Sequence, residues 1–510
     1  MMNISNKMPQ FPEPYWREIS LPEFEKVTKN ISVDVAIVGG GITGITAGYL
    51  LQKEGLKVAI LEADNLLNGT TGHTTAKVTA QHGLIYDELI QHFGEDHAKR
   101  YYQSADQSLQ FIKNLIQEKN IECDFSQEDA YIFATSELYK NKIQKEAEAY
   151  QKLGIAGELA SSIPFEIEIK TALSMKNQAQ FHPLKYFKQL VLDFVEAGGA
   201  VYEATTASDI EEDGDYPKVM TRDGHRVACK HVIIASHFPF FDKKGLYFAR
   251  MYPERSYAIG IKAKKPYPGG MYVSVDDPIR SLRYTPINGE NLIIIGGENH
   301  KAGHGPDTLE HYEALAQFAE KTVGIEDFKY RWSTQDLVTL DKLPYIGPIT
   351  AEKPHILLAT GYRKWGMTNG TTAAQLLADT ILEKENPYRD LFSPSRGLQA
   401  DPSLKSAISY NIDVAGQLIK GKIDVPNKNP ETLKEDEGSV VIVSGKRAGA
   451  YRDLEGQLHI VDTTCTHMGC ECEWNSGDRT WDCPCHGSRY TYDGNVIEGP
   501  TKKPLKKIDI

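Results

Sequence analysis

The 510-residue sequence predicts an α/β Rossmann-like domain interleaved with an α+β domain, followed by a small all-β domain. A strand, a glycine-rich turn, a helix and a second strand follow one another within residues 34–61. A similar strand, turn and helix return at 356–382, and a long strand-rich region lies between the two. Five of the seven cysteines fall within residues 465–485, which marks a third unit of different composition. At roughly 150 residues per domain, the length agrees with about three domains.

Composition and charge exclude several classes of protein. Hydrophobic residues make up 41% of the chain and charged residues 25%, as in an ordinary globular protein. The formal net charge of −12 repels phosphate backbones, so nucleic acid is not an expected partner. Residues 1–20 lack a basic segment followed by an apolar run, and the apolar stretch 33–51 contains five glycines. Neither a secretory signal nor a transmembrane segment is therefore expected. Scarce cysteine outside the C-terminal group favours a reducing, cytoplasmic location.

The first 386 residues alternate short apolar strands with helices. Residues 34–38 and 56–61 have the pattern of buried strands, and an apolar helix over 42–53 joins them. Residues 98–116 place apolar side chains at helical spacing on one face, and the helix 184–196 ends at two glycines. Further strands are predicted at 200–203, 218–221 and 231–235, a strand-rich region at 256–297, a buried strand at 292–295 ending at Gly296–Gly297, and a last strand and helix at 356–359 and 371–382.

The character of the chain changes after residue 386. Residues 387–433 are polar or charged and carry several prolines, so we interpret them as a linker between domains, with a helix at about 403–419. Residues 434–510 combine short strands, turns and the cysteine group. They are expected to form a separate small domain.

Gly39, Gly41 and Gly44 form a G-x-G-x-x-G motif after the first strand and at the start of a helix. The first glycine permits a tight turn, the second lets a pyrophosphate approach the backbone, and the third lets helix and strand pack closely. Free N–H groups at the helix N-terminus then face the phosphates. Glu62 closes the next strand, where it can accept hydrogen bonds from ribose hydroxyls. Because an acid there disfavours a ribose phosphate, the motif predicts a dinucleotide other than NADP.

The same region resembles the D-amino-acid oxidase-like flavoproteins, which include glycine oxidase, sarcosine oxidase, dimethylglycine dehydrogenase and gamma-glutamylputrescine oxidoreductase. The resemblance implies FAD as the cofactor. It also implies that a late glycine turn and its helix face the flavin pyrimidine, where the helix dipole stabilises the negative charge of reduced flavin. Beside the glycine motif and Glu62, the segments that carry the resemblance are 68–73, 181–183, 232–236, 341–347 and 359–368.

The resemblance implies a division of residues 1–386 into two interleaved parts. FAD-binding segments are expected at about 30–85, 175–240 and 335–386, and substrate-domain segments at about 86–174 and 241–334. The expected FAD-binding residues are Gly39, Gly41, Ile42, Thr43, Gly44, Glu62, Ala63, Thr70, Thr71, His73, Ala207, Ala235, Ser236, Gly361, Trp365, Gly366, Met367 and Thr368.

His73 has two interpretations. In dimethylglycine and sarcosine dehydrogenase relatives, a histidine in a similar Thr-Thr-x-His-Thr setting carries the flavin covalently. Residues 70–74 match that setting in outline, but Gly72 stands where those relatives have tryptophan. The alternative is a loop histidine near the pyrophosphate, and the sequence leaves both open.

Two loops near the C-terminus carry Cys465-x-His467 and, after 15 residues, Cys483-x-x-His486. Two cysteines and two histidines could hold zinc. The spacing instead favours a Rieske [2Fe-2S] cluster, in which one iron takes two thiolates and the other takes two imidazoles. Neutral imidazoles raise the reduction potential above that of an all-cysteine cluster. These four residues are therefore the expected iron ligands of a Rieske domain over 434–510.

The two loops resemble those of the Rieske proteins of respiratory cytochrome bc complexes. The resemblance implies a disulfide between Cys470 and Cys485 that joins the loops and is buried enough to survive reducing conditions. It also implies that Ser488 and Tyr490 donate hydrogen bonds to cluster and ligand sulfur, which stabilises the reduced state. Cys472 is left without an expected role.

The residues that face the substrate carry a weaker signal. Arg283 lies where relatives place residues near the flavin, Arg363 lies in the late flavin turn, and Tyr252 precedes a strand of the substrate domain. These three are the candidate catalytic residues. An arginine can clamp a substrate carboxylate through two parallel hydrogen bonds. The alternative for each is a salt bridge or a packing contact.

Fusing a flavin enzyme to a Rieske domain predicts electron transfer between them. A flavin accepts two electrons as a hydride, whereas a Rieske cluster carries one. The flavoprotein resemblance favours oxidation of a C–N bond in a small amine or amino acid, followed by export of electrons to an external one-electron acceptor. Two alternatives stay open. The cluster could receive electrons from a donor and feed the flavin for a reductive or monooxygenase-like reaction, or the chain could be a non-catalytic electron-transfer protein.

Overall fold

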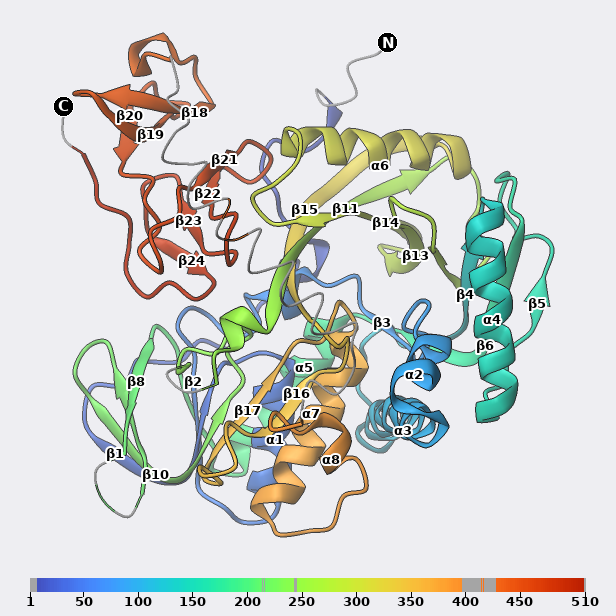
Figure 1. The fold of residues 1–510 in the computed structure, drawn as a ribbon, viewed down its shortest axis with the longest axis horizontal. Coiled ribbons are helices and arrows are strands. Elements are labelled where there is room, and N and C mark those ends of the chain that lie inside the picture. The colour runs from blue at the N-terminus through green and yellow to red at the C-terminus, as the bar shows by residue number, and fades with distance from the viewer. Residues whose placement is uncertain are drawn as a thin grey trace.

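The computed structural model describes residues 7–212, 214, 216–242, 245–396, 414, 416 and 428–508. Within them, an eight-stranded sheet and a nine-stranded sheet form the two large parts of the molecule, and two small antiparallel sheets form the C-terminal domain (Figure 1). The C-terminal domain, orange to red in Figure 1, lies beside both large parts. Each of the two large sheets is built from segments that lie far apart in the sequence.

The first sheet contains the strand–turn–helix–strand unit predicted from the sequence. Its order is β16-β17-β10-β1-β2-β7, with β8 and β9 attached beside β10. β1 pairs in parallel with both β2 and β10, and its last four residues are buried. The parallel pairing of β1 with β2 needs a crossover, which α1 supplies. The strands are β1 (Ile31–Val38), β2 (Val58–Leu61), β7 (Ala200–Tyr202), β8 (Ala207–Glu211), β9 (Lys218–Thr221), β10 (Arg226–Ile234), β16 (Tyr345–Pro348) and β17 (Ile356–Thr360).

Helices from distant parts of the chain pack together beside this sheet. α1 contacts α5 and α7, and α7 contacts α3. α1 packs closely because its glycines leave room for neighbouring side chains, as Gly48 does for Ile60 and Phe194. The helices of this layer are α1 (Ile42–Lys53), α2 (Tyr86–Phe93), α3 (Glu95–Lys119), α5 (Pro183–Glu196), α7 (Gly366–Ile381) and α8 (Arg389–Phe392), with the short η2 (Tyr15–Glu18) and η3 (Thr70–His73).

The second sheet is built from segments inserted between those of the first. Its order is β15-β11-β14-β13-β12-β4-β6-β3, with β5 beside β6. α6 covers β11, β14 and β15, and α4 packs against β4 and β6 (Figure 1). The strands are β3 (Lys77–Val78), β4 (Ser126–Ala134), β5 (Leu159–Ala160), β6 (Thr171–Gln180), β11 (Met251–Ala263), β12 (Met271–Ser274), β13 (Arg280–Ile287), β14 (Glu290–Lys301) and β15 (Ile325–Thr339); the helices are α4 (Glu137–Leu153), α6 (Thr308–Thr322) and η4 (Tyr247–Ala249).

The C-terminal domain consists of a three-stranded sheet, β18-β19-β20, and a four-stranded sheet, β21-β22-β23-β24. All of its strand pairs are antiparallel. The expected ligand loops lie between β20 and β21 and between β22 and β23. The elements are η5 (Pro430–Thr432), β18 (Glu437–Val443), β19 (Lys446–Arg452), β20 (Leu458–Val461), β21 (Glu473–Asn475), β22 (Thr480–Asp482), β23 (Arg489–Thr491) and β24 (Val496–Glu498).

Three elements differ from the sequence-based expectation. α7 begins at Gly366, five residues before the expected start, because Trp365 caps it and accepts a hydrogen bond from the Asn369 N–H. β14 continues past Gly296 and Gly297 to Lys301, since both glycines pair with β11 and β13. β3 joins the second sheet, although residues 77–78 were expected in an FAD-binding segment. The helix expected at 403–419 lies outside the described residues, apart from Val414 and Gly416.

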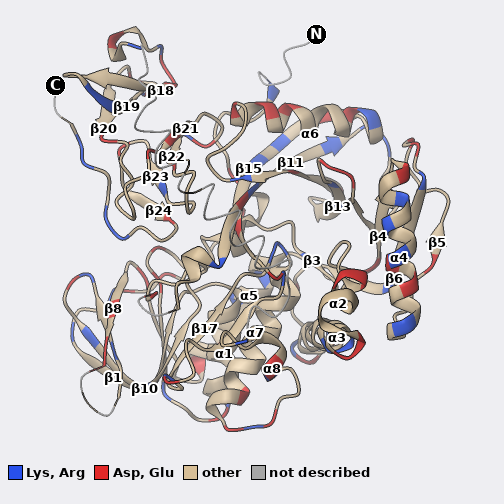
Figure 2. Cartoon of the chain, viewed as in Figure 1, with Lys and Arg blue, Asp and Glu red and all other residues tan. Residues whose placement is uncertain are grey.

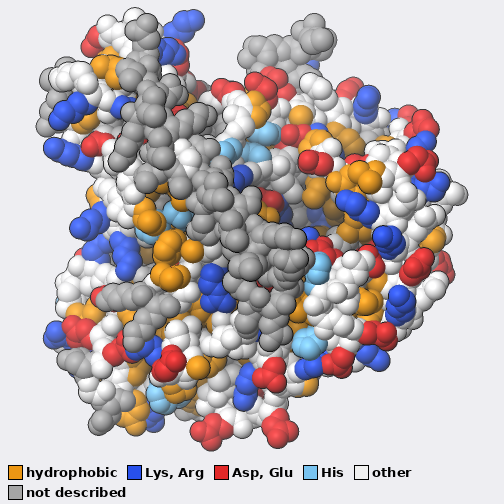
Figure 3. All heavy atoms as spheres, viewed as in Figure 1, with side chains coloured by type: hydrophobic (Ala, Val, Ile, Leu, Met, Phe, Trp, Pro, Cys, Tyr) orange, Lys and Arg blue, Asp and Glu red, His pale blue; other side chains and the backbone are white. Residues whose placement is uncertain are grey.

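The described part of the chain has no helix long and apolar enough to cross a membrane. Both acidic and basic residues occur along the helices α4 and α6 (Figure 2). Hydrophobic side chains, orange in Figure 3, gather on the visible face near the boundary between the C-terminal domain and the first sheet. The candidate site lies at this boundary.

Candidate functional site

The glycine turn after β1 has the close backbone approach that its motif predicts. Gly39 has a φ of +114°, and a Cβ there would lie 2.3 Å from the carbonyl oxygen of Ala235. A Cβ on Gly44 would lie 1.9 Å from the carbonyl oxygen of Gly39. The Ile42 N–H at the start of α1 donates to Thr71 Oγ1 at 3.1 Å, which fixes the η3 loop beside the turn. Only glycine fits at positions 39 and 44 without moving the backbone.

A cavity of about 1040 Å³ opens beside this turn. Its volume is at the upper end of the roughly 300–1,000 Å³ typical of ligand pockets, which fits an extended dinucleotide. Fifteen of the eighteen expected FAD-binding residues line it: Gly39, Gly41, Ile42, Thr43, Glu62, Ala63, Thr70, Thr71, His73, Ala207, Ala235, Ser236, Trp365, Gly366 and Met367. Gly44, Gly361 and Thr368 lie behind this lining.

Glu62 and the N-terminus of α7 mark two ends of the cavity. The Glu62 carboxylate accepts hydrogen bonds from the N–H groups of Gly40 at 2.7 Å and Asp64 at 3.0 Å. Burial raises the pKa of Glu62. At the other end, Gly366 and Met367 in the first turn of α7 line the cavity, so the positive end of the helix dipole faces it. Such an end stabilises negative charge on a bound group.

Two residues that sequence reasoning missed support the α7 end. The hydroxyls of Tyr362 and Thr43 share a hydrogen bond of 2.7 Å, which joins the segment before α7 to α1. His82 stacks on Trp365, with ring centroids 5.0 Å apart, and lies 2.9 Å from Thr368 Oγ1. Burial lowers the pKa of His82 to about 3, so the ring is neutral at pH 7. Tyr362 lies within the segment 359–368 but was not singled out from the sequence, and His82 belongs to no recognisable motif.

His73 lies at the wall of the cavity that faces the C-terminal domain. Its Nδ1 is 3.0 Å from the Gly69 carbonyl oxygen, and its own carbonyl accepts a hydrogen bond from Trp332 Nε1 at 2.8 Å. Burial lowers the pKa of the ring; Arg489 of the C-terminal domain lowers it further, and Glu498 of the same domain opposes the shift. This position near the domain boundary is compatible with both interpretations of His73.

Two of the three candidate catalytic residues line the cavity, and the third does not. Arg363 and Tyr252 line the cavity, and Arg363 Nε is buried without a hydrogen-bond partner among the described residues. Arg283 differs from the expectation, because it is absent from the cavity lining. Its guanidinium donates to the carbonyl oxygens of Tyr284, Thr75, Ala76 and Phe181. Arg283 therefore holds the chain just before β3 in place.

Lys77, which sequence reasoning passed over, lines the cavity instead. Its Nζ donates to the hydroxyls of Thr75 at 3.1 Å and Ser281 at 3.2 Å, and no carboxylate of the described residues pairs with it. Burial lowers the pKa of Lys77 to about 7, and the nearby Arg283 adds to this. The signal available in the sequence was a charged residue between apolar neighbours.

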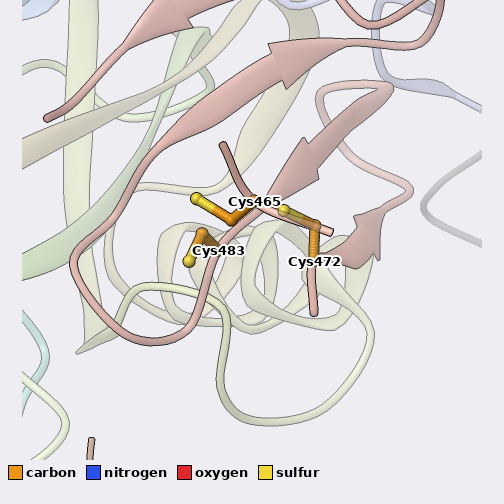
Figure 4. Close-up of side chains that lie close together, drawn as sticks. All are labelled: Cys465, Cys472 and Cys483. Carbon is orange, nitrogen blue, oxygen red and sulfur yellow. The ribbon is translucent and has the colours of Figure 1, made fainter. Parts of the chain in front are cut away.

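The expected iron ligands meet at the tips of two loops of the C-terminal domain. The sulfur atoms of Cys465 and Cys483 lie within 4.8 Å of each other, as two ligands of one iron require. The rings of His467 and His486 have centroids 5.1 Å apart. Cys472, which had no expected role, also lies at this site, because its sulfur is within 4.8 Å of the other two sulfurs (Figure 4). The donor set of two thiolates and two imidazoles fits a Rieske cluster.

The surroundings of these loops also fit the cluster. Cys470 and Cys485 form the expected disulfide, with a sequence separation of 15. The Tyr490 hydroxyl lies 3.3 Å from Cys465 Sγ. Ser488 Oγ is buried and has no hydrogen-bond partner among the described residues. A buried hydroxyl without a partner is unfavourable unless a bound group, here a cluster sulfide, accepts its hydrogen bond.

Replacing Tyr490 with phenylalanine is expected to lower the reduction potential of the cluster. The lost hydrogen bond stabilises the reduced, more negative state, and about 0.5–1.5 kcal/mol corresponds to roughly 20–60 mV for one electron. A redox titration followed by the cluster's visible circular dichroism measures the shift. An unchanged or higher potential would show that the hydroxyl does not act on the ligand sulfur. Tyr492→Phe, on a partly exposed side chain directly after β23, is the control.

The C-terminal domain forms part of the same cavity. Its last hairpin and the following turn close the side near η3 and β8. Because of this arrangement, the flavin-side residues and the segment 491–504 of the C-terminal domain line the same cavity, whereas the expected iron ligands are not part of its lining. The contributing residues are Thr491, Asn495, Val496, Ile497, Glu498, Gly499, Pro500, Thr501, Lys502 and Pro504.

A buried ionic network holds the C-terminal domain in this position. Arg255 of β11 is 1% exposed and lies 3.5 Å from Asp478, 3.6 Å from Asp482 and 3.4 Å from Glu498. Arg489 pairs with the same three acids at 2.9–3.2 Å. Burial raises the pKa of Asp482, but the two guanidinium groups outweigh it and hold the pKa at about 2. The stability that this carboxylate contributes is therefore complete above its unfolded pKa of about 4 and is lost as the pH falls toward 2.

Comparison with known proteins agrees with this division. Residues 34–380 match the family model for FAD dependent oxidoreductase, and residues 422–509 match that for the Rieske [2Fe-2S] domain. The chain is 52% identical over 500 residues to the Rieske 2Fe-2S iron-sulfur protein YhfW of Bacillus subtilis (strain 168), covering 98% of each chain.

Relatives of each part were also found. The gamma-glutamylputrescine oxidoreductase of Escherichia coli (strain K12) is 24% identical over 383 residues, covering 70% of this chain and 85% of that protein. The crystal structure of glycine oxidase from Geobacillus kaustophilus has the same fold, with a TM-score of 0.62, 21% identity, and coverage of 72% of this chain and 100% of that one. The cytochrome b6-f complex iron-sulfur subunit 1 of Synechocystis sp. (strain ATCC 27184 / PCC 6803 / Kazusa) is 53% identical over 102 residues, which cover 19% of this chain and 56% of that subunit.

The oxidoreductase part therefore binds FAD and the Rieske part binds a [2Fe-2S] cluster. The glycine turn, the long cavity and the α7 N-terminus fit the first cofactor, and the paired thiolates and imidazoles with the unpartnered Ser488 hydroxyl fit the second. The chain belongs to the DAO family of FAD-dependent oxidoreductases and carries a Rieske [2Fe-2S] domain at its C-terminal end.

Proposed function

We propose that this oxidoreductase oxidises a C–N bond of a small amine or amino acid and passes the electrons, one at a time, to the Rieske cluster and then to an external one-electron acceptor. The observation that carries the proposal is the shared cavity, lined by the flavin site on one side and by residues 491–504 of the Rieske domain on the other. The names of the relatives, glycine oxidase and gamma-glutamylputrescine oxidoreductase, support the substrate class.

The chain's own residues would position the reactants. When bound, FAD supplies a two-electron acceptor and the cluster a one-electron carrier. The α7 N-terminus stabilises negative charge at one end of the cavity. Arg363 and Tyr252 are the proposed substrate-facing residues, since both line the cavity and the Arg363 Nε has no other partner among the described residues. The Rieske residues at 491–504 keep water out of the side that they cover.

We propose Cys465 and Cys483 as ligands of one iron and His467 and His486 as ligands of the other. The proposed domains are an oxidoreductase domain 1–386, a linker 387–433 and a Rieske domain 434–510. The family match at 34–380 supports the first boundary, and the match at 422–509 supports a separate Rieske domain, although it begins inside the proposed linker. The scarcity of cysteine outside the Rieske loops supports a reducing, cytoplasmic environment.

Anaerobic titration with a panel of amines and amino acids tests the proposal. A substrate is expected to bleach the flavin absorbance and then to produce the EPR signal of the reduced cluster. Reduction of the chain by ferredoxin or NAD(P)H, with no response to any amine, would contradict the proposed direction of electron flow. That outcome would instead favour a cluster that feeds electrons to the flavin.

A further inference from the structure

A short chain of contacts links the expected iron ligand His486 to the cavity. The residue after it, Gly487, accepts a hydrogen bond on its carbonyl oxygen from Gln335 Nε2 at 2.8 Å. The carbonyl oxygen of the same Gln335 accepts a hydrogen bond from Thr70 Oγ1 at 3.2 Å. Thr70 is one of the residues that line the flavin side of the cavity. Two hydrogen bonds and otherwise covalent bonds therefore lead from the ligand to the cavity.

We propose that Gln335 is the electron-transfer bridge between the flavin site and the Rieske cluster. The inference rests on the proposed exchange of electrons between the two cofactors. Electrons tunnel better along covalent bonds and hydrogen bonds than across van der Waals gaps. Gln335 makes one contact through its side chain, to Gly487 of the Rieske domain, and the other through its backbone carbonyl, to Thr70, and it therefore gives a strongly coupled route.

The orientation of the Gln335 amide is fixed by the docking network. Its Oε1 accepts a hydrogen bond from Arg255 Nη2 at 3.1 Å, so the NH₂ group must face Gly487. Gln335 is 2% exposed, so its amide is shielded from solvent. Arg255 thus serves both domain docking and the orientation of the bridge.

Gly487 is the partner that the short contact requires. It has a φ of +71°, and a Cβ there would lie 2.6 Å from Pro253 Cβ and 2.9 Å from Gln335 Nε2. Any larger residue would push the ligand loop away from β11 and β15. The absent side chain lets a peptide carbonyl, bonded directly to an iron ligand residue, touch the oxidoreductase domain.

Phe248 of the oxidoreductase domain also lies against the expected ligands. Its ring packs edge-on against His467 and His486, with centroids 5.7 and 5.4 Å away. Phe248 is not among the residues that line the cavity, whereas Thr70 is. The route through Gln335 is therefore the more direct of the two.

The electron balance of the step is simple. One electron leaves the reduced flavin and reduces one ferric ion of the cluster to the ferrous state. The cluster must pass this electron to its external one-electron acceptor before it can take the second. A reduced flavin in its anionic form would release one proton on full reoxidation, and that proton would leave through the cavity to solvent.

Flash photoreduction tests the bridge without a substrate. A light pulse with deazaflavin and EDTA reduces the flavin in the intact, fully loaded protein, and absorbance follows electron arrival at the cluster. In Gln335→Met, the transfer rate is expected to fall about five- to tenfold, because the 2.8 Å hydrogen bond to Gly487 becomes a van der Waals gap of about 3.7 Å, while the backbone contact to Thr70 remains. Thr70→Val is expected to slow it as well, and redox titration checks that both potentials stay unchanged.

Thr308→Val is the matched control. Thr308 bonds to Asn475 at 2.7 Å and to Gly477 at 2.8 Å across the same interface but off the route. The wild-type rate in Thr308→Val, with slower Gln335→Met, supports the bridge. An unchanged rate in Gln335→Met, or equal slowing in all variants, overturns it. If the wild-type protein transfers no electron from flavin to cluster, the proposed function itself fails, which is a distinct result.

Discussion

Replacing Arg255 with leucine is expected to destabilise the docked Rieske domain by about 3–5 kcal/mol, the usual cost of removing one partner from a buried ionic network. Asp478, Asp482 and Glu498 would then share only Arg489 in an interior position. Two of these side chains are 5% exposed, so water cannot replace the lost guanidinium at low cost. The orientation of Gln335 would be lost at the same time.

Urea unfolding, followed by the visible circular dichroism of the cluster, measures this effect. The midpoint is expected to fall clearly in Arg255→Leu. Lys384→Leu is the matched control, because its ion pair with Glu54 is about half exposed and contributes little. Equal midpoints for Arg255→Leu and wild type would show that the network does not hold the domains together.

Replacing Gly44 with alanine is expected to lower FAD content by more than about tenfold while leaving iron content unchanged. The new Cβ would lie 1.9 Å from the Gly39 carbonyl oxygen, so the turn and α1 must separate. A backbone shift at this position moves the helix N-terminus that faces the phosphates. The Rieske domain has its own sheets and its own ligands, so it is expected to keep its cluster.

The flavin-to-iron ratio of the purified protein measures this prediction. Gly48→Ala is the control on the same helix, since its Cβ would meet only side-chain atoms of Ile60 and Phe194 at 3.1–3.3 Å. It is expected to keep the wild-type ratio. Full FAD content in Gly44→Ala would contradict the role given to the close turn.

Local sequence patterns predicted the parts of this molecule whose chemistry depends on adjacent residues. The glycine turn after β1, Glu62 and the two ligand loops each follow from spacing along a short segment, because a tight turn or an iron ligand pair constrains neighbouring positions. The same holds for α1, whose predicted bounds agree with the structure.

Side chains brought together from distant segments could not be predicted in this way. Arg283 was expected at the cavity, but the fold surrounds it with carbonyl oxygens that satisfy its guanidinium. Lys77 and Gln335 have no motif, and they reach the cavity and the domain interface only when β3 and β15 are placed. The docking of the Rieske domain onto the flavin site is likewise a property of the buried charges on both surfaces, not of either sequence segment alone.

Flash photoreduction of the wild-type protein at several protein concentrations tests the central claim, which is that flavin and cluster exchange electrons within one chain. The docked arrangement predicts that the rate of cluster reduction stays the same as the protein is diluted, because the electron never leaves the molecule. A rate that falls in proportion to protein concentration would show transfer between molecules and would contradict the claim.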